Sequence, residues 1–417
     1  MNESYTLAVN VTHAVITAPT QWGALYGLES FFQLVLIEPW EVCPVCNKYV
    51  LRVDVPFTIH DTPRVQWRGL MIDTGRHYLP PVVIKRAIDA MAASKLNALH
   101  WHLTDDQSFP VCLDAQPDLC RLSQYHDHVT GAPRNYTSAV IRDVVEYATD
   151  RGVRIMPELD LPGHSVGLQR GAPALYTNCT STHKVPDPTT DDFFQLIDSI
   201  VGELATLFPD RHFHMGGDEV DTSCWTENPA VVKWMAGKNL TAMGTLGYFQ
   251  SRIQSIVASH GKASMFWDEF WVANLAALNS TVAEIRSTAF AETLASGRKA
   301  LTAGINEAWY LDHGIANPRF IQSDWEPYYL HDPFDGLSGI ELENVLGGEV
   351  DMWGEGVDET NFEPRVFPWA SAVAERLWSP ADRSGSTVEA EPRLDGFRCL
   401  LVRRGIRAAP IGPGAPC

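Results

Sequence analysis

Two adjacent carboxylates, Asp218 and Glu219, follow the pair Gly216-Gly217 at the end of the apolar segment 212–216. Their side chains diverge, so one can serve a leaving group while the other serves another part of a substrate. Two close negative charges also help to raise the pKa of one carboxyl group, as a general acid requires. An isolated Asp-Glu pair is usually a solvated surface feature. Here the glycines end a segment typical of a buried strand and let the backbone approach a site, so we interpret the pair as acid/base machinery.

Further polar and aromatic side chains follow other apolar segments in the same way. The candidates are Arg76, Asp105, His164, Trp267, Tyr310, Asp312, Trp353 and Glu355. Carboxylates accept hydrogen bonds from hydroxyl groups, and indole rings pack on the apolar face of a pyranose. The set therefore suits a neutral polyhydroxyl substrate.

The segments that carry these residues alternate with amphipathic helix patterns from about residue 65 onwards. The predicted strands are 66–73, 97–103, 153–159, 212–216, 263–267, 282–285, 300–303 and 345–348. Between the first two strands, residues 82–95 predict a helix with Ile84, Ile88 and Met91 on one face. Eight such units predict an α/β fold with a closed (β/α)8 barrel, in which the site lies at the carboxyl ends of the strands.

The first 64 residues follow another pattern and predict a small α+β domain, so the expected domains are 1–64 and 65–417. Strand patterns occur at 5–9, 14–17 and 50–55, and a helix pattern at 22–36. The tail from residue 395 predicts a short helix and a Gly/Pro-rich end. Met1 leads almost directly into the first strand with no visible signal peptide, so we expect this N-terminal domain to be partial.

Composition restricts the partners and the compartment. A net charge of −19 over 417 residues disfavours nucleic acid and anionic membranes as partners. Membrane insertion is not expected, because the apolar runs fall short of the ~20 residues that a spanning helix needs. Eight cysteines and six Asn-X-Ser/Thr sequons favour the secretory pathway, hence a lysosomal or secreted protein. The sequons begin at Asn2, Asn10, Asn135, Asn178, Asn239 and Asn279.

Three blocks of sequence resemble glycoside hydrolase family 20, and most closely the eukaryotic lysosomal type of β-N-acetylhexosaminidase. They are Arg68 to Tyr78, His100 to Pro110, and His214 to Val220, which holds the Gly-Gly-Asp-Glu motif. The resemblance extends from about residue 4 to residue 417. It implies removal of terminal non-reducing β-linked GlcNAc or GalNAc from glycoconjugates or chitooligosaccharides. It implies no cofactor and no metal, and it allows a homodimer.

The same resemblance implies a substrate-assisted retaining mechanism, an exception to the usual two-carboxylate scheme. The 2-acetamido oxygen of the substrate attacks the anomeric carbon, and Glu219 protonates the leaving oxygen and then activates water. Asp218 would hold the acetamido N–H, and Tyr310 the acetamido oxygen. The remaining roles are also implied by the resemblance. Arg76, Asp312 and Glu355 would bind the sugar, Asp105 and His164 would support Glu219, and Trp267 and Trp353 would wall the pocket.

One departure from the family pattern falls at the sixth predicted strand, where the family places a further Trp. This chain has Ala283-Glu284-Ile285-Arg286 there. Ile285 would keep an apolar wall without a flat face, whereas Arg286 could stack its planar guanidinium but brings charge. A shifted loop with another residue in the gap is the third alternative. We expect altered catalytic efficiency or substrate preference.

Two rival functions use parts of the same sequence. A binuclear metal hydrolase could use His100, His102, His164, His214 and Asp268, but it leaves the Asp218-Glu219 pair unexplained. A glycan-binding protein without turnover is supported only by the missing Trp. We interpret His100 and His102 as packing or supporting residues. Trp309, Trp369 and Trp378 are interpreted as core residues.

Spacing alone leaves the cysteine pairing open. We expect Cys43–Cys46, Cys112–Cys120, Cys179–Cys224 and Cys399–Cys417, of which the last two resemble bridges of the family. The pair Cys43–Cys46 is the least favoured, because a CxxC loop is tight.

Overall fold

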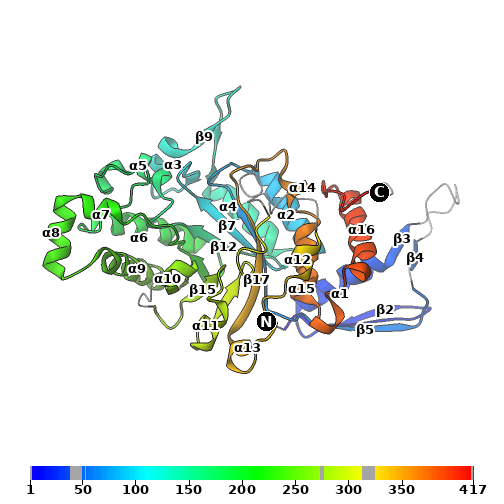
Figure 1. Cartoon of the computed structure of the whole chain (residues 1–417). Coiled ribbons are helices and arrows are strands. Elements are labelled where there is room, and N and C mark those ends of the chain that lie inside the picture. Colours follow the sequence, from blue (N-terminus) through cyan, green and yellow to red (C-terminus); the bar gives the residue numbers. More distant parts are fainter. Residues whose placement is uncertain (1, 38–48, 52, 273–276, 312–324, 415–416) are drawn as a thin grey trace.

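The computed structural model describes residues 2–37, 49–51, 53–272, 277–311, 325–414 and 417, and Figure 1 shows their arrangement. Eight parallel strands close into a barrel in the order β12-β13-β14-β15-β16-β17-β6-β7. Their bounds are β6 (Trp67–Asp73), β7 (Ala98–Thr104), β12 (Arg154–Leu159), β13 (His212–His214), β14 (Ala263–Phe266), β15 (Val282–Ile285), β16 (Ala300–Thr302) and β17 (Val345–Met352). The predicted (β/α)8 barrel is confirmed.

Two strand lengths differ from the prediction, and both differences have a physical cause. Strand β13 ends at His214 rather than residue 216, because Gly216 turns the backbone to a positive φ of 60°. Strand β17 continues to Met352 rather than ending at 348. The buried Glu349 and Asp351 lie inside this strand, and their polarity hid its full length.

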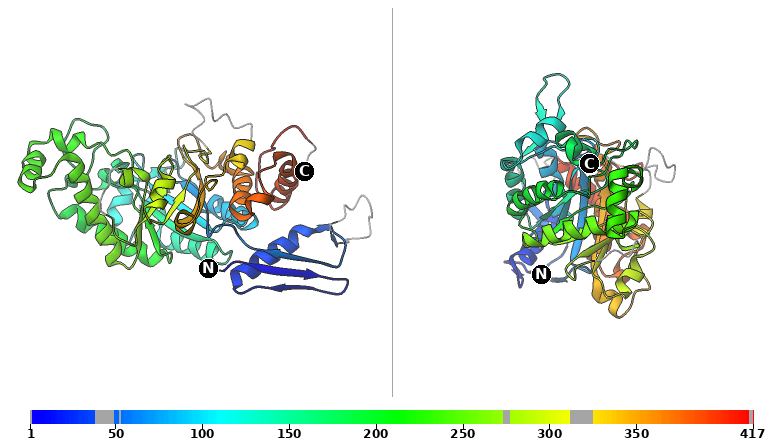
Figure 2. Two further views of the ribbon diagram at one scale, coloured as in Figure 1. Left: turned by 60° about the horizontal axis from the view of Figure 1, so that its bottom comes forward. Right: turned by 90° about the vertical axis from the view of Figure 1, so that its left-hand side faces the viewer.

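Helices surround the barrel on its outer side, as in the first and second views (Figures 1 and 2). The longer ones are α2 (Pro81–Ala93), α4 (Ser138–Thr149), α6 (Asp192–Leu207), α8 (Pro229–Lys238), α9 (Ala242–Ser259), α15 (Trp369–Trp378) and α16 (Thr387–Arg403). Helix α2 confirms the helix predicted at 82–95 and buries Ile84, Ile88 and Met91 on one face. Thr137 caps α4 by accepting a hydrogen bond from the backbone N–H of Val140.

Short elements connect these layers. The helices are α3 (Pro117–Ser123), α5 (Val166–Gly171), α7 (Ser223–Glu227), α10 (Asp268–Val272), α11 (Phe290–Ala295), α12 (Glu326–Leu330), α13 (Ile340–Asn344) and α14 (Phe362–Val366). The strands are β8 (Val111–Cys112), β9 (Tyr125–His126), β10 (Pro133–Arg134) and β11 (Tyr136–Thr137). Within the described part of the chain, no helix combines the length and the apolar character needed to cross a bilayer.

The N-terminal unit is an antiparallel sheet in the order β2-β1-β5 with one helix against it. It contains β1 (Tyr5–Val9), β2 (Ala14–Thr17), α1 (Gln21–Leu34) and β5 (Phe57–Asp61), and β3 (Val35–Ile37) pairs with β4 (Tyr49–Leu51). The strand expected at 50–55 is therefore wrong in its extent, since β4 ends at residue 51. The division into domains at residue 64 stays a prediction.

A buried ion pair and an aromatic contact connect this unit to the barrel. Arg68 of β6 forms an ion pair with Glu3 at 2.8 Å, and both are buried. The ring of Tyr26 on α1 meets that of Trp378 on α15 edge to face at 5.0 Å. Figure 2 shows the sheet as an arm beside the barrel.

Helix α16 begins at Thr387, so the short helix expected from residue 395 is longer than predicted.

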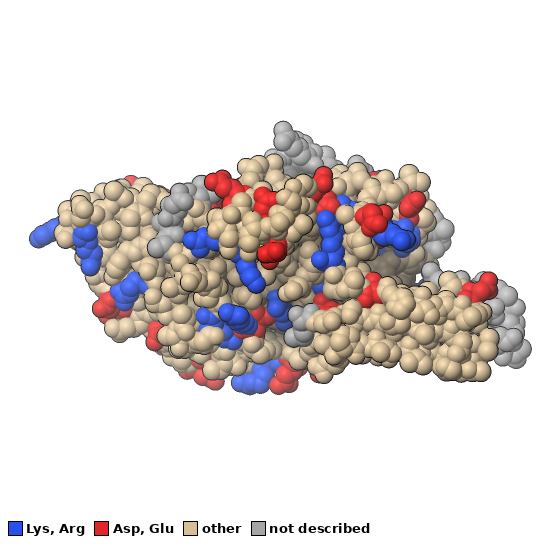
Figure 3. Space-filling model, turned by 90° about the horizontal axis from the view of Figure 1, so that it is seen from below, with Lys and Arg blue, Asp and Glu red and all other residues tan. Residues whose placement is uncertain are grey.

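On the face drawn in Figure 3, acidic and basic side chains are interspersed rather than gathered in one basic patch.

Trp309, Trp369 and Trp378 are buried, which confirms their interpretation as core residues.

Three of the four expected disulfides are present, namely Cys112–Cys120, Cys179–Cys224 and Cys399–Cys417. Cys43 and Cys46 lie outside the described residues. The bridge Cys179–Cys224 links residues 45 positions apart, so it restricts the unfolded chain more than the other two do.

We predict that thiol-specific labelling of the native protein leaves these six cysteines unmodified. Labelling after reduction and unfolding should reveal them, which provides the control. Mass spectrometry of the labelled peptides identifies each site. Modification of Cys179 or Cys224 in the native, unreduced protein would contradict the best-supported pairing.

Candidate active site

The turn after β13 places the two adjacent carboxylates, and it depends on glycine. Gly216 and Gly217 have φ angles of 60° and 100°, in the region that L side chains rarely adopt. A Cβ on Gly216 would lie 1.8 Å from Asp160 Oδ1, which instead accepts a hydrogen bond from the Gly217 N–H at 2.8 Å. The interpretation of this glycine pair as a feature of close approach is therefore correct.

The two carboxyl groups diverge as expected. Asp218 is buried, with 3% of its surface exposed, whereas 69% of the Glu219 side chain is exposed at the rim. Glu219 itself has a φ of 47°, a conformation that costs about 1 kcal/mol or more in a residue other than glycine. One carboxyl group thus faces the barrel interior and its neighbour faces the entrance.

A chain of charged groups leads inward from Glu219. His164 Nε2 lies 3.5 Å from Glu219 Oε2, and His164 Nδ1 lies 3.3 Å from Asp105 Oδ1. Asp105 Oδ2 accepts a hydrogen bond from His102 Nε2 at 2.8 Å. Burial opposes the charge on His164, but the hydrogen bonds to Asp105 and Glu219 raise the pKa of His164 strongly.

The protonation of Glu219 differs from the prediction. The hydrogen bond from His164 lowers the pKa of Glu219 to about 2, with further lowering by the charges of His164, Arg286 and Arg76. Burial works in the opposite direction but is outweighed, so the pKa rise expected for Glu219 beside Asp218 is not found. In the free protein Glu219 is therefore ionised at mildly acidic pH.

Arg76 lies beside this chain and is held by carboxylates on three sides. Its guanidinium contacts Asp73 at 2.8 Å, Asp105 at 3.1 Å and Glu355 at 3.3 Å. Its Cζ lies 4.8 Å from the centre of the Trp353 ring. Burial disfavours the charge, but these three carboxylates raise the pKa of Arg76. Arg76 and Glu355 are thus brought together at the mouth of the barrel.

Aromatic side chains line the floor of the mouth. The Trp267 and Trp353 rings lie 5.8 Å apart, and Tyr310 lies 5.9 Å from Trp353. Met71 and Ala303 complete this cluster, and all five side chains are buried. A separate hollow of about 150 Å³ is lined by Glu219, His164 and His183. Asp312 lies outside the described residues.

Arg286 replaces the aromatic residue expected at the end of β15. Ile285 is fully buried in the main hydrophobic core, so it does not line the site. Arg286 Nη1 lies 3.3 Å from both Asp218 Oδ2 and Tyr310 Oη. Its Cζ lies 5.5 Å from the centre of the Trp267 ring. The guanidinium therefore contacts Asp218 Oδ2 and Tyr310 Oη, the two atoms that the resemblance assigns to binding of the acetamide.

Two acidic residues after β14 hold Arg286 from the other side. Its Nε lies 3.4 Å from Asp268, and its Nη2 forms an ion pair with Glu269. Burial raises the pKa of Glu269 to about 7; Asp218 and Asp268 add to this rise, and Arg286 opposes it. The sequence interpretation did not identify this acidic clamp, although its position directly after Trp267 at a strand end was a usable signal.

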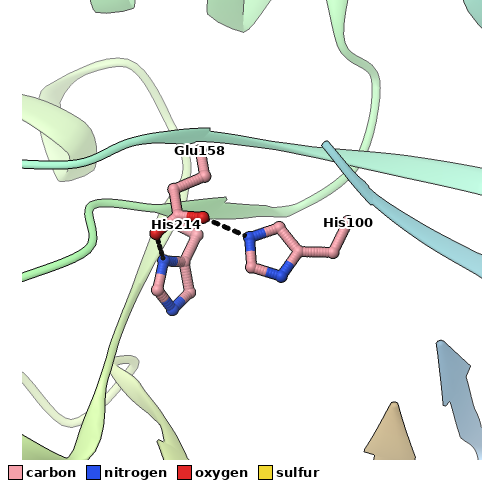
Figure 4. A group of neighbouring side chains, drawn as sticks. All are labelled: His100, Glu158 and His214. Atoms are coloured by element: carbon pink, nitrogen blue, oxygen red, sulfur yellow. Dashed lines mark hydrogen bonds and ion pairs between the residues drawn. The ribbon is translucent and has the colours of Figure 1, made fainter. Parts of the chain in front are cut away.

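Below the mouth, the barrel interior is polar. Figure 4 shows His100 and His214 directed at Glu158, with His100 Nε2 and His214 Nδ1 each 2.9 Å from a Glu158 oxygen. A metal ion could be reached by these three residues, whose ligand atoms lie within 4.8 Å. The binuclear set considered from the sequence does not form one site, however, because His164 pairs with Glu219 and Asp268 with Arg286.

A closed barrel with carboxylates, indoles and two arginines at its mouth is typical of a (β/α)8-barrel glycoside hydrolase. Comparison with known families places it further. The glycosyl hydrolase family 20 catalytic domain matches residues 65–381, and a β-acetyl hexosaminidase-like family matches residues 1–34. The chain belongs to glycosyl hydrolase family 20, and its class is that of the β-N-acetylhexosaminidases.

Individual relatives agree with this assignment. The chain is 36% identical to β-hexosaminidase 3 of Arabidopsis thaliana, covering 99% of this chain and 75% of the relative. It is 37% identical to the human β-hexosaminidase subunit beta, covering 99% and 73%. A chitobiase structure from Flavobacterium johnsoniae superposes with a TM-score of 0.83 at 30% identity. The superposition covers 97% of this chain and 60% of the chitobiase, so the chain spans about three fifths of that protein.

We predict that Arg286→Trp raises kcat/KM on a neutral N-acetylglucosaminide by roughly tenfold, equivalent to about 1.4 kcal/mol of transition-state stabilisation. The change frees Asp218 and Tyr310 and restores a flat wall. The variant should also carry Asp268→Asn, since loss of the guanidinium leaves buried carboxylates without a counter-charge.

The control is Arg286→Ala with the same Asp268→Asn change, which frees the same atoms without adding an aromatic face. A gain in both variants assigns the effect to release of Asp218, and a gain with Trp alone assigns it to stacking. Unchanged or lower kcat/KM in both folded variants would contradict the prediction. Ile285→Trp is unsuitable as a control, because overpacking a buried site typically costs about 1–3 kcal/mol.

Proposed function

We propose that this β-N-acetylhexosaminidase is an exo-glycosidase that removes terminal, non-reducing, β-linked N-acetylhexosamine with help from the acetamido group of the substrate. One observation carries the proposal. Buried Asp218 and Tyr310 converge on one atom, Arg286 Nη1, whose guanidinium lies over the Trp267 ring, with Glu219 at the rim. An N-acyl group that displaced this guanidinium would meet a carboxylate for its N–H and a phenol for its oxygen.

In the proposed first step, the acetamido oxygen attacks the anomeric carbon and the glycosidic bond breaks. Glu219 gives its proton to the departing oxygen, and the ring nitrogen of the resulting oxazolinium keeps its hydrogen bond to Asp218. In the second step, Glu219 takes a proton from water as the water attacks the anomeric carbon and reopens the ring. Two displacements at the same carbon retain the β configuration.

The low pKa of Glu219 constrains how this acid is prepared. A carboxylate that is ionised in the free protein must gain a proton when substrate binds. A sugar that covers the exposed side chain would remove water from it, and desolvation raises the pKa of a carboxyl group. We infer that binding and protonation of Glu219 are coupled, and that His164 stays charged beside it through its bond to Asp105.

The sugar itself would be held from two sides. Arg76 and Glu355 lie together at the mouth, where they can donate to and accept from hydroxyl groups. Trp353 would form part of the wall around the sugar ring. Its indole already packs against the Arg76 guanidinium, which belongs to the same proposed set. Asp312 keeps its proposed place in the substrate-binding set on the resemblance alone.

A catalytically impaired glycan-binding protein is the second candidate, and Arg286 is the observation that favours it. The guanidinium is held by Asp218, Asp268, Glu269 and Tyr310 at once. An acetamide must displace it before Asp218 and Tyr310 can bind the substrate. Turnover of a chromogenic N-acetylglucosaminide separates the two candidates.

We also propose that the protein enters the secretory pathway as a lysosomal or secreted glycoprotein. The three disulfides support an oxidising compartment. The sequon residues Asn2, Asn178, Asn239 and Asn279 are exposed, as glycan attachment requires. A homodimer stays part of the proposal, and sedimentation analysis of the purified protein tests it.

We predict that Glu219→Gln lowers kcat by about 10²–10⁴, the usual contribution of a general acid/base group. The amide is nearly isosteric but cannot donate the proton. Circular dichroism and binding of N-acetylglucosamine should stay close to those of the wild type, because the exposed side chain supports no core contact. A folded variant with wild-type kcat would refute the assignment.

We predict that a plain β-glucoside is essentially inert, whereas the matching N-acetyl-β-glucosaminide is hydrolysed. Removing a group that takes part in the chemistry should lower kcat as well as raise KM. Asp218→Asn should lose most activity on the N-acetyl substrate, since a neutral amide stabilises a cationic intermediate poorly. Comparable kcat/KM for the two substrates would exclude substrate assistance.

A further inference from the structure

Glu158 lies at the centre of the barrel interior, on β12, with no exposed surface. Its Oε1 accepts a hydrogen bond from the Trp267 indole N–H at 2.9 Å and lies 2.9 Å from His214 Nδ1. Its Oε2 lies 2.6 Å from His102 Nδ1 and 2.9 Å from His100 Nε2. Each oxygen of this carboxylate thus faces two nitrogen atoms from neighbouring strands.

These contacts connect Glu158 to both halves of the proposed site. Through Oε1 it holds the indole of Trp267, the ring that packs against Trp353 and lies under Arg286. Through Oε2 it holds His102, whose other nitrogen donates to Asp105. Asp105 contacts His164, and His164 contacts Glu219. One buried carboxylate therefore reaches a wall of the pocket and the acid/base group by separate atoms.

Other titratable groups around Glu158 are arranged so that this carboxylate keeps its charge. His100 and His102 of β7 and His214 of β13 hold the pKa of Glu158 well below its ordinary range, although burial works against them. Glu284 of β15 and Asp351 of β17 also lie near it. Burial, together with the nearby Glu349, holds the pKa of both groups well above the ordinary range, so they are neutral. Asp160, on the loop after β12, is also neutral, because burial and Asp218 raise its pKa.

The barrel also makes room for the second charged carboxylate of this interior. Gly69 on β6 faces Glu349, and a Cβ at that glycine would lie 2.4 Å from the Glu349 Cβ. Glu349 accepts hydrogen bonds from His100 Nδ1 at 2.7 Å and from the Trp67 indole at 2.9 Å. His100 thus has a carboxylate on each side, and burial does not prevent these two charges from raising its pKa to about 10.

We propose that Glu158 is a positioning residue for the reaction, which fixes Trp267 with one carboxylate oxygen and the His102–Asp105–His164–Glu219 chain with the other. The inference rests on the proposed function, since it assigns Glu158 a role in that same site. It goes further in naming a residue that touches neither the sugar nor the reacting atoms. An amide at this position weakens one of the two arms, because the end that becomes NH2 can no longer accept a hydrogen bond from the nitrogen atoms that it faces.

The test compares Glu158→Gln with Glu284→Gln. Both residues are fully buried in the barrel interior, and both changes replace one oxygen by NH2. We expect Glu158→Gln to lower kcat/KM on the N-acetylglucosaminide by at least about tenfold, the order expected for lost hydrogen bonds to a charged group. We expect Glu284→Gln to stay near the wild type, because the neutral carboxyl group is replaced by another neutral donor. Equal losses in both variants would overturn the proposal in favour of general packing.

A second variant, His102→Gln, separates the two arms and does not depend on Glu158→Gln being folded. It removes the imidazolium of His102 from the chain to Glu219 but leaves the Glu158–Trp267 hydrogen bond in place. Loss of the cation beside Asp105 should raise the pKa of Glu219, so the basic limb of kcat against pH, which reports the acid in the substrate complex, should move upwards by a few tenths of a unit. KM should stay within about twofold of the wild type. An unchanged pH profile in a folded His102→Gln protein would overturn the acid/base arm.

Binding of the N-acetylglucosamine thiazoline, measured by calorimetry, distinguishes failure of the inference from failure of the proposed function. A wild type that binds the thiazoline without turnover refutes the function, and weaker binding by Glu158→Gln than by Glu284→Gln still supports positioning of Trp267. An active wild type with unchanged kcat/KM, pH profile and thiazoline affinity in folded Glu158→Gln refutes the inference alone.

Discussion

Burial of ionised carboxylates inside a closed barrel is the constraint on which this structure depends. A charge without a partner in such an interior is so unfavourable that the group takes up or loses a proton instead. Glu158 and Glu349 keep their charges because His100 and His102 lie against them, whereas Glu284, Asp351 and Asp160 are neutral. The protonation pattern of the interior therefore follows from which strands supply imidazoles and which supply carboxyl groups.

The same constraint explains the mouth of the barrel. Arg76 is balanced by Asp73, Asp105 and Glu355, and Arg286 by Asp218, Asp268 and Glu269. These two guanidinium groups lie near the proposed acid/base residue Glu219, and both lower its pKa. The first belongs to the sugar-binding set that the family resemblance implies. The second stands where the family resemblance implies an aromatic wall, and it makes the proposed acetamide pocket of this chain charged.

The sequence predicted the barrel well because buried parallel strands have a simple pattern: each is an apolar run that ends in polar residues. It failed where polarity lies inside the strand, as at Glu349 and Asp351 in β17. The members of the site were also recognisable at strand ends, and Arg286 was one of the alternatives considered. The low pKa of Glu219 was not predictable, since it depends on a 3.5 Å contact with His164, 55 positions away in sequence. The role of Glu158 was hidden for the same reason, because its partners come from three other segments.

The stereochemistry of the first product formed tests the central claim most directly. Proton NMR spectra recorded during the first minutes of hydrolysis distinguish the two anomers of the released N-acetylhexosamine before they equilibrate in water. Attack by the acetamido oxygen followed by attack of water inverts the anomeric carbon twice, so the account predicts that the β anomer appears first. Initial release of the α anomer would show a single displacement by water and would contradict the account.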